Sequence, residues 1–207
     1  MSKMDKQVMV VPREKLLGSE HFEGFALHGT TNFVSRILTA YEYMRRGDAE
    51  ENPAYKQPIC YVAIINPQTK SVYAYERASN DNTGDARLHG LHSWGFGGHV
   101  EPCDTGKNPL FASRVRELQE EIRGTFSEPI VLGYINDESD AVNQVHFGVL
   151  CAVETTGDVA LNDPALINGR WVPIADLERL VQSNAKVEAW SRIAVEPLKN
   201  YFSIRAR

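Results

Sequence analysis

Two short segments decide the fold: residues 97–101 read Gly-Gly-His-Val-Glu, and residues 116–122 read Arg-Glu-Leu-Gln-Glu-Glu-Ile. Three carboxylates in the second segment, Glu117, Glu120 and Glu121, lie three and four residues apart. On an α-helix this spacing gathers them within an arc of about 100°. Like charges so placed destabilise an isolated helix by roughly 0.2–0.5 kcal/mol per pair. Neighbouring arginines or a bound cation must therefore offset the repulsion.

Two interpretations of this helix compete. Arg116 and Arg123 have the spacing to pair with Glu120, which is typical of a solvated, salt-bridged helix face. The upstream glycines favour a functional site instead, because glycine lets the backbone come close to a ligand or metal ion.

The two segments resemble the signature of the Nudix hydrolases, which ends in Arg-Glu, an aliphatic residue, any residue, Glu-Glu, any residue and Gly. Gly98 matches the first glycine of that signature, and residues 116–121 match its core in register. Asp104 stands where a Glu is expected, with Glu101 as the alternative first acid. The linker from Asp104 to the arginine holds eleven residues instead of seven, and the closing Gly124 comes one residue late.

The segments 88–102, 133–138 and 145–148 resemble a subgroup of uncharacterised microbial Nudix proteins, in which a longer linker is usual. The resemblance implies an α/β fold, an α/β/α sandwich around a mixed β-sheet, for residues 51–207. Residues 1–50 precede the usual start of such a domain, so we expect an N-terminal elaboration packed on it.

The resemblance also implies roles for individual residues. In Nudix hydrolases the helix glutamates bind divalent metal ions, and the arginine orients a glutamate. Mg²⁺ and Mn²⁺ suit oxygen ligands, and such ions neutralise a diphosphate and activate water. The implied catalytic residues are Arg116, Glu117, Glu120 and Glu121. The implied metal ligands are Glu117, Glu120, Glu121 and Gly98, with Gly97 and Gly98 bordering the cofactor.

The general base is left open by the sequence. Glu138 and Asp140 are candidates, although the acidic joint that contains them is also ordinary turn chemistry. His99 and His146 stand in predicted strands, and we interpret both as structural histidines.

The implied activity is hydrolysis of a diphosphate linkage in a nucleoside diphosphate derivative. A non-catalytic ligand-sensing module on the same fold is the alternative, against which the retained carboxylates count. An isomerase like isopentenyl diphosphate isomerase ranks last, because its cysteine and glutamate motifs find no clear match.

Composition narrows the class of protein. The 207 residues suffice for one sizeable core, and the net charge of −5 argues against a general nucleic-acid or membrane-surface binder. No apolar run is long enough to cross a bilayer. Three cysteines suggest neither a zinc site nor a disulfide framework, which favours a reducing cytoplasm. A homodimer is possible, and the sequence does not determine the oligomeric state.

Apolar periodicity predicts the main elements. Phe111, Val115, Leu118 and Ile122 form a stripe expected to face the core, with the acids away from it. The segments 48–53 and 78–87 are expected to be exposed loops, the second beside the ligand. The expected strands are 7–12, 58–66, 71–77, 129–136, 145–153 and 171–173. The expected helices are 31–46, 111–123, 174–180 and 185–202.

Overall fold

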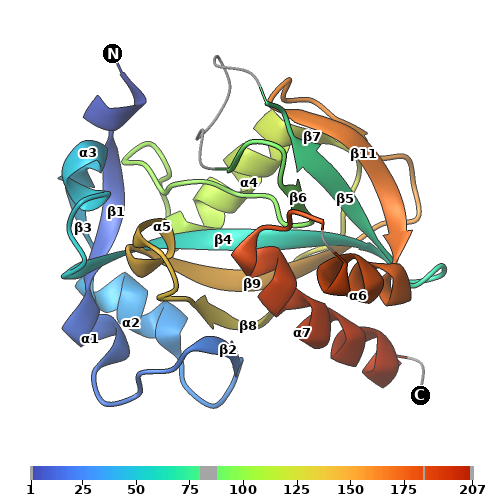
Figure 1. Ribbon diagram of the computed structural model, residues 1–207. Coiled ribbons are helices and arrows are strands. Elements are labelled where there is room, and N and C mark those ends of the chain that lie inside the picture. The colour runs from blue at the N-terminus through green and yellow to red at the C-terminus, as the bar shows by residue number, and fades with distance from the viewer. Residues whose placement is uncertain (1, 80–87, 184, 206–207) are drawn as a thin grey trace. The chain divides into compact units, whose positions relative to one another are not determined.

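Figure 1 shows the computed structural model, which describes residues 2–79, 88–183 and 185–205. The chain divides into two compact units. Most of the predicted ligand-side loop 78–87 lies outside the described residues. Three elements have several residues in each unit: β4 (Tyr55–Asn66), α4 (Pro109–Glu121) and β9 (His146–Glu154). Unit 1 comprises Met1–Tyr61, Gly97–Arg116 and Val131–Leu150. Unit 2 comprises Val62–Phe96, Glu117–Ile130 and Cys151–Arg207.

Unit 1 contains short strands and helices besides its parts of the shared elements. Its strands are β1 (Gln7–Pro12), β2 (Gly24–Leu27), β3 (Glu42–Arg45) and β8 (Ile130–Asn136, without Ile130). Its helices are η1 (Lys3–Asp5), α1 (Arg13–Leu17), α2 (Phe33–Ala40), α3 (Arg46–Ala49) and α5 (Ala141–Gln144). Strand β1 pairs antiparallel with both β3 and β4, and β2 pairs antiparallel with β8. The predicted strand over residues 7–12 is confirmed.

The single helix predicted over residues 31–46 is wrong. Asn32 caps a shorter helix, α2, by accepting a hydrogen bond from the Ser35 backbone at 3.0 Å. The chain then becomes extended, because residues 42–45 pair along β1 as strand β3. Met44 packs on Val8 and Val10, as alternation in a strand allows. The predicted loop 48–53 is also partly helical, since it begins inside α3.

Unit 2 holds the antiparallel strands that follow β4. Its strands are β5 (Ser71–Arg77), β6 (His92–Ser93), β7 (Ile122–Arg123), β10 (Ala160–Leu161) and β11 (Leu166–Pro173). Its helices are α6 (Ile174–Gln182) and α7 (Ala189–Arg205). Strand β5 pairs with β4, β6 and β11, and β7 pairs with β10. Helix α7 begins later than predicted, because the backbone of Lys186 and Glu188 is bonded to His92 of β6.

The sheet is mixed, as expected from the sequence. In unit 1 the Gln57 N–H of β4 donates to the Val145 carbonyl just before β9, at 2.7 Å. In unit 2 the Thr155 N–H just after β9 donates to the Ile65 carbonyl at 3.0 Å. Residue numbers thus rise together along β4 and β9, so these neighbours are parallel. The strand order is β4-β9-β8-β2 in unit 1 and β11-β5-β4-β9 in unit 2.

Each unit has an aromatic core. In unit 1, Phe33 of α2 packs against Tyr134 of β8 and Phe147 of β9, with ring centroids 4.9 and 5.4 Å away. In unit 2, Tyr75 of β5 packs on Phe96 at 4.8 Å. Such aromatic contacts contribute about 0.5–1.5 kcal/mol beyond area burial, so they help to hold the elements of each unit together.

Candidate functional site

Helix α4 carries all four residues predicted to be catalytic, namely Arg116, Glu117, Glu120 and Glu121. Glu121 is buried, Glu117 is half-buried and Glu120 is exposed. The helix begins after Asn108, whose side chain accepts a hydrogen bond from the Phe111 backbone at 3.1 Å. This cap satisfies one of the unpaired donors of the first turn.

The core-facing stripe predicted for α4 and the residue after it is confirmed at Ile122, which is buried, and is wrong at Val115. Val115 was expected inside but is 47% exposed, whereas Leu110 and Ser113 are buried. Glu117 and Glu121 follow Ser113 at helical spacings of four, so they continue the buried stripe. The two carboxylates therefore lie on the buried side of the helix and not opposite to it. A buried carboxylate is stabilised either by hydrogen bonds or by a cation.

The C-terminal end of α4 is held by unit 2. Ile122 and Arg123 leave the helix and pair as β7 with β10, which is why the helix stops two residues before its predicted end. The carbonyls of Glu120 and Glu121 accept hydrogen bonds from the Asn162 side chain and backbone, at 3.0 and 2.8 Å. These bonds satisfy carbonyls that a helix end leaves unpaired. The last turn of α4 is thereby fixed.

Arg116 makes a two-pronged ion pair with Asp104. Its Nε and Nη2 atoms donate to the two carboxylate oxygens at 2.8 and 2.9 Å, and Nη2 also donates to the His99 carbonyl at 2.9 Å. Asp104 in turn accepts from the Glu101 backbone N–H at 2.8 Å. Glu101 instead pairs with Lys6, at 2.8 Å. Between the two candidate first acids, Asp104 is the one that meets the signature arginine.

The first glycine of the pair, Gly97, serves close backbone packing. Gly97 has φ +149°, and a Cβ atom there would lie 2.1 Å from the Cys60 carbonyl oxygen of β4. No other residue type fits at that distance. The close approach expected of Gly97 is therefore made to a strand of the sheet. Its role beside a cofactor, and that of Gly98 as a metal ligand, stay predictions.

A half-buried cation in unit 2 was missed by the sequence analysis. Arg77 of β5 donates through Nε to Glu188 at 2.8 Å, and Glu188 also accepts from the Ser93 hydroxyl at 2.9 Å. Burial alone would lower the pKa of Arg77, but the side chains of Tyr75, Glu188 and Glu121 raise it. Arg77 therefore offsets part of the negative charge at Glu121. Nothing in the local sequence distinguishes this arginine from others.

The two candidate bases have structural partners within unit 1. Glu138 pairs with Arg13 and with the fully buried Lys56, at 2.8 and 2.9 Å. Burial would raise the pKa of Glu138, but hydrogen bonds from Arg13 and Lys56 lower it, which makes this carboxylate a weaker base. Asp140 caps α5 by accepting from the Asn143 backbone at 2.8 Å. These contacts favour structural roles for both residues.

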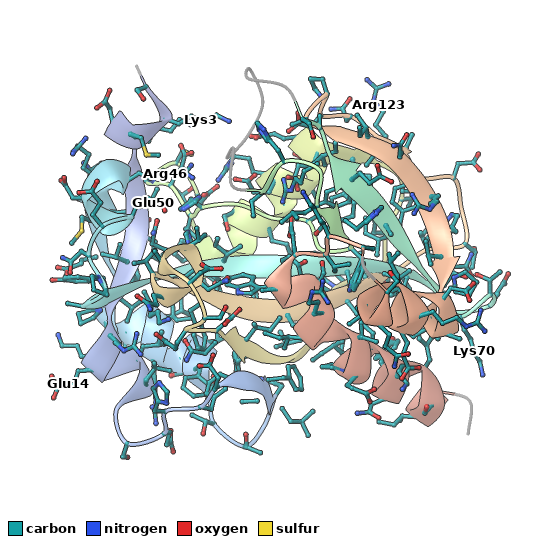
Figure 2. The ribbon with its side chains drawn as sticks, in the orientation of Figure 1. Lys3, Glu14, Arg46, Glu50, Lys70 and Arg123 are labelled. Atoms are coloured by element: carbon teal, nitrogen blue, oxygen red, sulfur yellow. The ribbon has the colours of Figure 1, made fainter. Side chains whose placement is uncertain are left out.

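A second group of possible metal ligands lies entirely in unit 1. His99, His146 and Glu50 each offer one ligand atom, and these three atoms lie within 4.8 Å of one another. Arg46 and Glu50 come from α3 and its C-terminal end, where Figure 2 labels them. The Arg46 Nε donates to Glu50 at 3.2 Å. The sequence analysis missed Glu50, because one acid in an acidic tract carries no signal.

The mixed sheet and the Arg-Glu and Glu-Glu pairs on α4 define a protein of the Nudix type, and the chain belongs to the Nudix hydrolase superfamily. No family model matches the sequence. Its relatives include protein YmaB of Bacillus subtilis, which is 34% identical over 96% of this chain and all of YmaB.

Solved structures agree with this assignment. Tm1382, a proposed Nudix hydrolase, is 26% identical and superimposes with a TM-score of 0.80 over 95% of this chain and 100% of its own. The Nudix domain of Shewanella oneidensis NrtR, solved in complex with ADP ribose, has the same fold. It is 16% identical, with a TM-score of 0.55 over 70% of this chain and 88% of that chain. Within the described ranges, no helix is both long and apolar enough to span a membrane.

Proposed function

We propose that this protein hydrolyses a diphosphate linkage in a nucleoside diphosphate derivative, with Mg²⁺ or Mn²⁺ as cofactor. The observation that carries the proposal is the last turn and a half of α4. It brings three carboxylates together, places two of them on the buried side of the helix, and is fixed at its C-terminal end. A set of oxygen donors is what a hard divalent cation requires.

The carboxylates and the residues around them would have different roles. Glu117, Glu120 and Glu121 would hold the metal, which when bound neutralises the diphosphate and lowers the pKa of an attacking water. Arg116 would position the helix, because its guanidinium is committed to Asp104 and to the His99 carbonyl. By resemblance to the family, the Gly98 carbonyl would be a further ligand.

Family and charge together support the proposed substrate class. The NrtR Nudix domain was solved with ADP ribose, a nucleoside diphosphate derivative, which supports a small nucleotide as the ligand here. A net charge of −5 gives no general affinity for nucleic acid. The three free cysteines fit a reducing cytoplasm, which is the location we propose.

The test is a metal-dependent activity screen of wild type and the Glu120→Gln variant. The panel holds nucleoside diphosphate sugars, ADP-ribose, dinucleoside polyphosphates, nicotinamide dinucleotides and oxidised nucleoside triphosphates. We expect Mg²⁺- or Mn²⁺-dependent release of a nucleoside monophosphate, reduced about 10²–10³-fold in the variant, as for the loss of one preorganised electrostatic group. Glu128→Gln, an exposed glutamate of the same unit, is the matched control.

Equal turnover by wild type and Glu120→Gln would show that the mechanism is wrong. Tight nucleotide binding without metal-dependent turnover would instead support the ligand-sensing module.

A further inference from the structure

We propose that His99, His146 and Glu50 form a binding site for a divalent transition metal ion, Zn²⁺ in the first place. The three side chains come from distant parts of the sequence and all belong to unit 1. The site uses none of the carboxylates of α4. It also differs from them in chemistry, since two imidazoles and one carboxylate favour Zn²⁺ over Mg²⁺.

The distances suit a small ion. The Nε2 atoms of His99 and His146 lie 3.2 Å apart. Two nitrogens each about 2.0–2.1 Å from one tetrahedral zinc ion are separated by about 3.3 Å. The Glu50 Oε1 atom lies 3.7 Å from the His99 Nε2 and 3.9 Å from the His146 Nε2. A shift of about 0.5 Å would bring it to the same spacing, which one side-chain rotation supplies.

The surroundings of His146 determine which of its two ring nitrogens carries the proton. The His146 Nδ1 lies 2.6 Å from the Val142 carbonyl, so this nitrogen carries the proton and donates it. The Nε2 of His146 is then left with its lone pair directed at His99. A ligating histidine that donates its other N–H to a carbonyl is the usual arrangement at metal sites.

The three proposed ligands are buried together. The side chains of His99, His146 and Glu50 are only 12%, 8% and 8% exposed. The Glu50 Oε1 atom that faces the two histidines is also the one that accepts from Arg46, and a carboxylate oxygen has a second lone pair with which to bind an ion.

The competing explanation is a hydrogen bond between two neutral imidazoles, for which 3.2 Å is also suitable. That bond accounts for the histidines, and the ion pair with Arg46 accounts for Glu50. A metal ion would account for the approach of all three ligand atoms to one point. A metal ion would also hold the His99 side chain. Since Arg116 holds the His99 carbonyl, the segment that follows the glycine pair would then be anchored through both groups of His99.

The test compares metal content in variants that separate this site from α4. Chelator-treated protein is dialysed against micromolar Zn²⁺, and bound zinc is measured by elemental analysis. We expect one tightly bound zinc per chain in wild type and in Glu120→Gln. His146→Gln and Glu50→Gln should bind at least about tenfold more weakly. His21→Gln, an exposed histidine of the same unit, is the matched control.

A second measurement needs no variant. X-ray absorption at the zinc edge of the loaded wild-type protein should show scattering from two imidazoles. Zinc bound without imidazole scattering would overturn the proposal, even if His146→Gln failed to fold. So would the absence of stoichiometric zinc, or equal zinc content in wild type and a folded His146→Gln. Loss of Mg²⁺-dependent hydrolysis in Glu120→Gln bears only on the function proposed above, so the two proposals fail separately.

Discussion

The ion pair between Asp104 and Arg116 gives a prediction about the lengthened linker. Asp104→Ala removes two charge-assisted hydrogen bonds from Arg116 and one from the Glu101 backbone. The Asp104 side chain is 3% exposed and that of Arg116 is 25% exposed. Breaking a buried pair by removing one partner costs about 3–5 kcal/mol. Because Arg116 keeps the His99 carbonyl and some solvent, we expect a loss of about 2–4 kcal/mol in unfolding free energy.

The assay is urea denaturation followed by tryptophan fluorescence and circular dichroism. The matched control is Glu101→Ala, three residues away in the same turn. Its partner Lys6 is 48% exposed, so that exposed pair contributes at most about 1 kcal/mol. Because both acids lie in one turn, general effects of altering the linker cancel when the unfolding free energies of the two variants are compared.

Equal destabilisation by Asp104→Ala and Glu101→Ala, both below about 1 kcal/mol, would refute the reasoning. It would mean that solvent replaces the Asp104 carboxylate without cost. Asp104→Asn adds a further check, because it keeps the shape and loses the charge. We expect its unfolding free energy to fall between those of wild type and Asp104→Ala.

Two other perturbations follow from the packing. Glu138→Gln leaves the buried Lys56 without its charged partner and should cost about 2–4 kcal/mol at pH 7 in urea denaturation. Since folding lowers the pKa of Glu138, the deficit should shrink as pH falls below about 4.3, and a pH-independent deficit would contradict the ion-pair account. Gly97→Ala would put a methyl group 2.1 Å from the Cys60 carbonyl oxygen, and should lower the thermal midpoint with a cost of about 3–5 kcal/mol. Gly106→Ala, at φ +116° with no atom within 4 Å, should cost only about 1 kcal/mol. Equal costs for the two variants would show that the backbone conformation, and not the contact with Cys60, determines the loss of stability.

The strands were predictable because a buried strand appears in the sequence as a run of apolar residues. The run over residues 58–66 and the strand over residues 7–12 are apolar almost throughout, and both are strands in the structure. The helix predicted over residues 31–46 failed for a tertiary reason. The pairing of residues 42–45 with β1 outweighed a helical pattern of apolar residues.

The candidate site was predictable in composition but not in orientation. The spacing of Glu117 and Glu121 placed them on one side of a helix, yet the apolar stripe did not show that this side is buried as well. Val115 and Phe111 looked like core residues, whereas the burial of Leu110 and Ser113 sets the real register. Arg77 and Glu50 were missed, because only the folded chain brings them to their partners.

The turn that holds Asp104 also carries Cys103, the exposed member of the three free cysteines. Cys60 and Cys151 are buried, so a maleimide reagent has one accessible thiol in the native protein. A fluorophore or spin label attached there would sit next to the carboxylate that anchors the signature arginine. The chain thus carries a natural attachment point for a spectroscopic probe of its own ligand binding, without the introduction of any new cysteine.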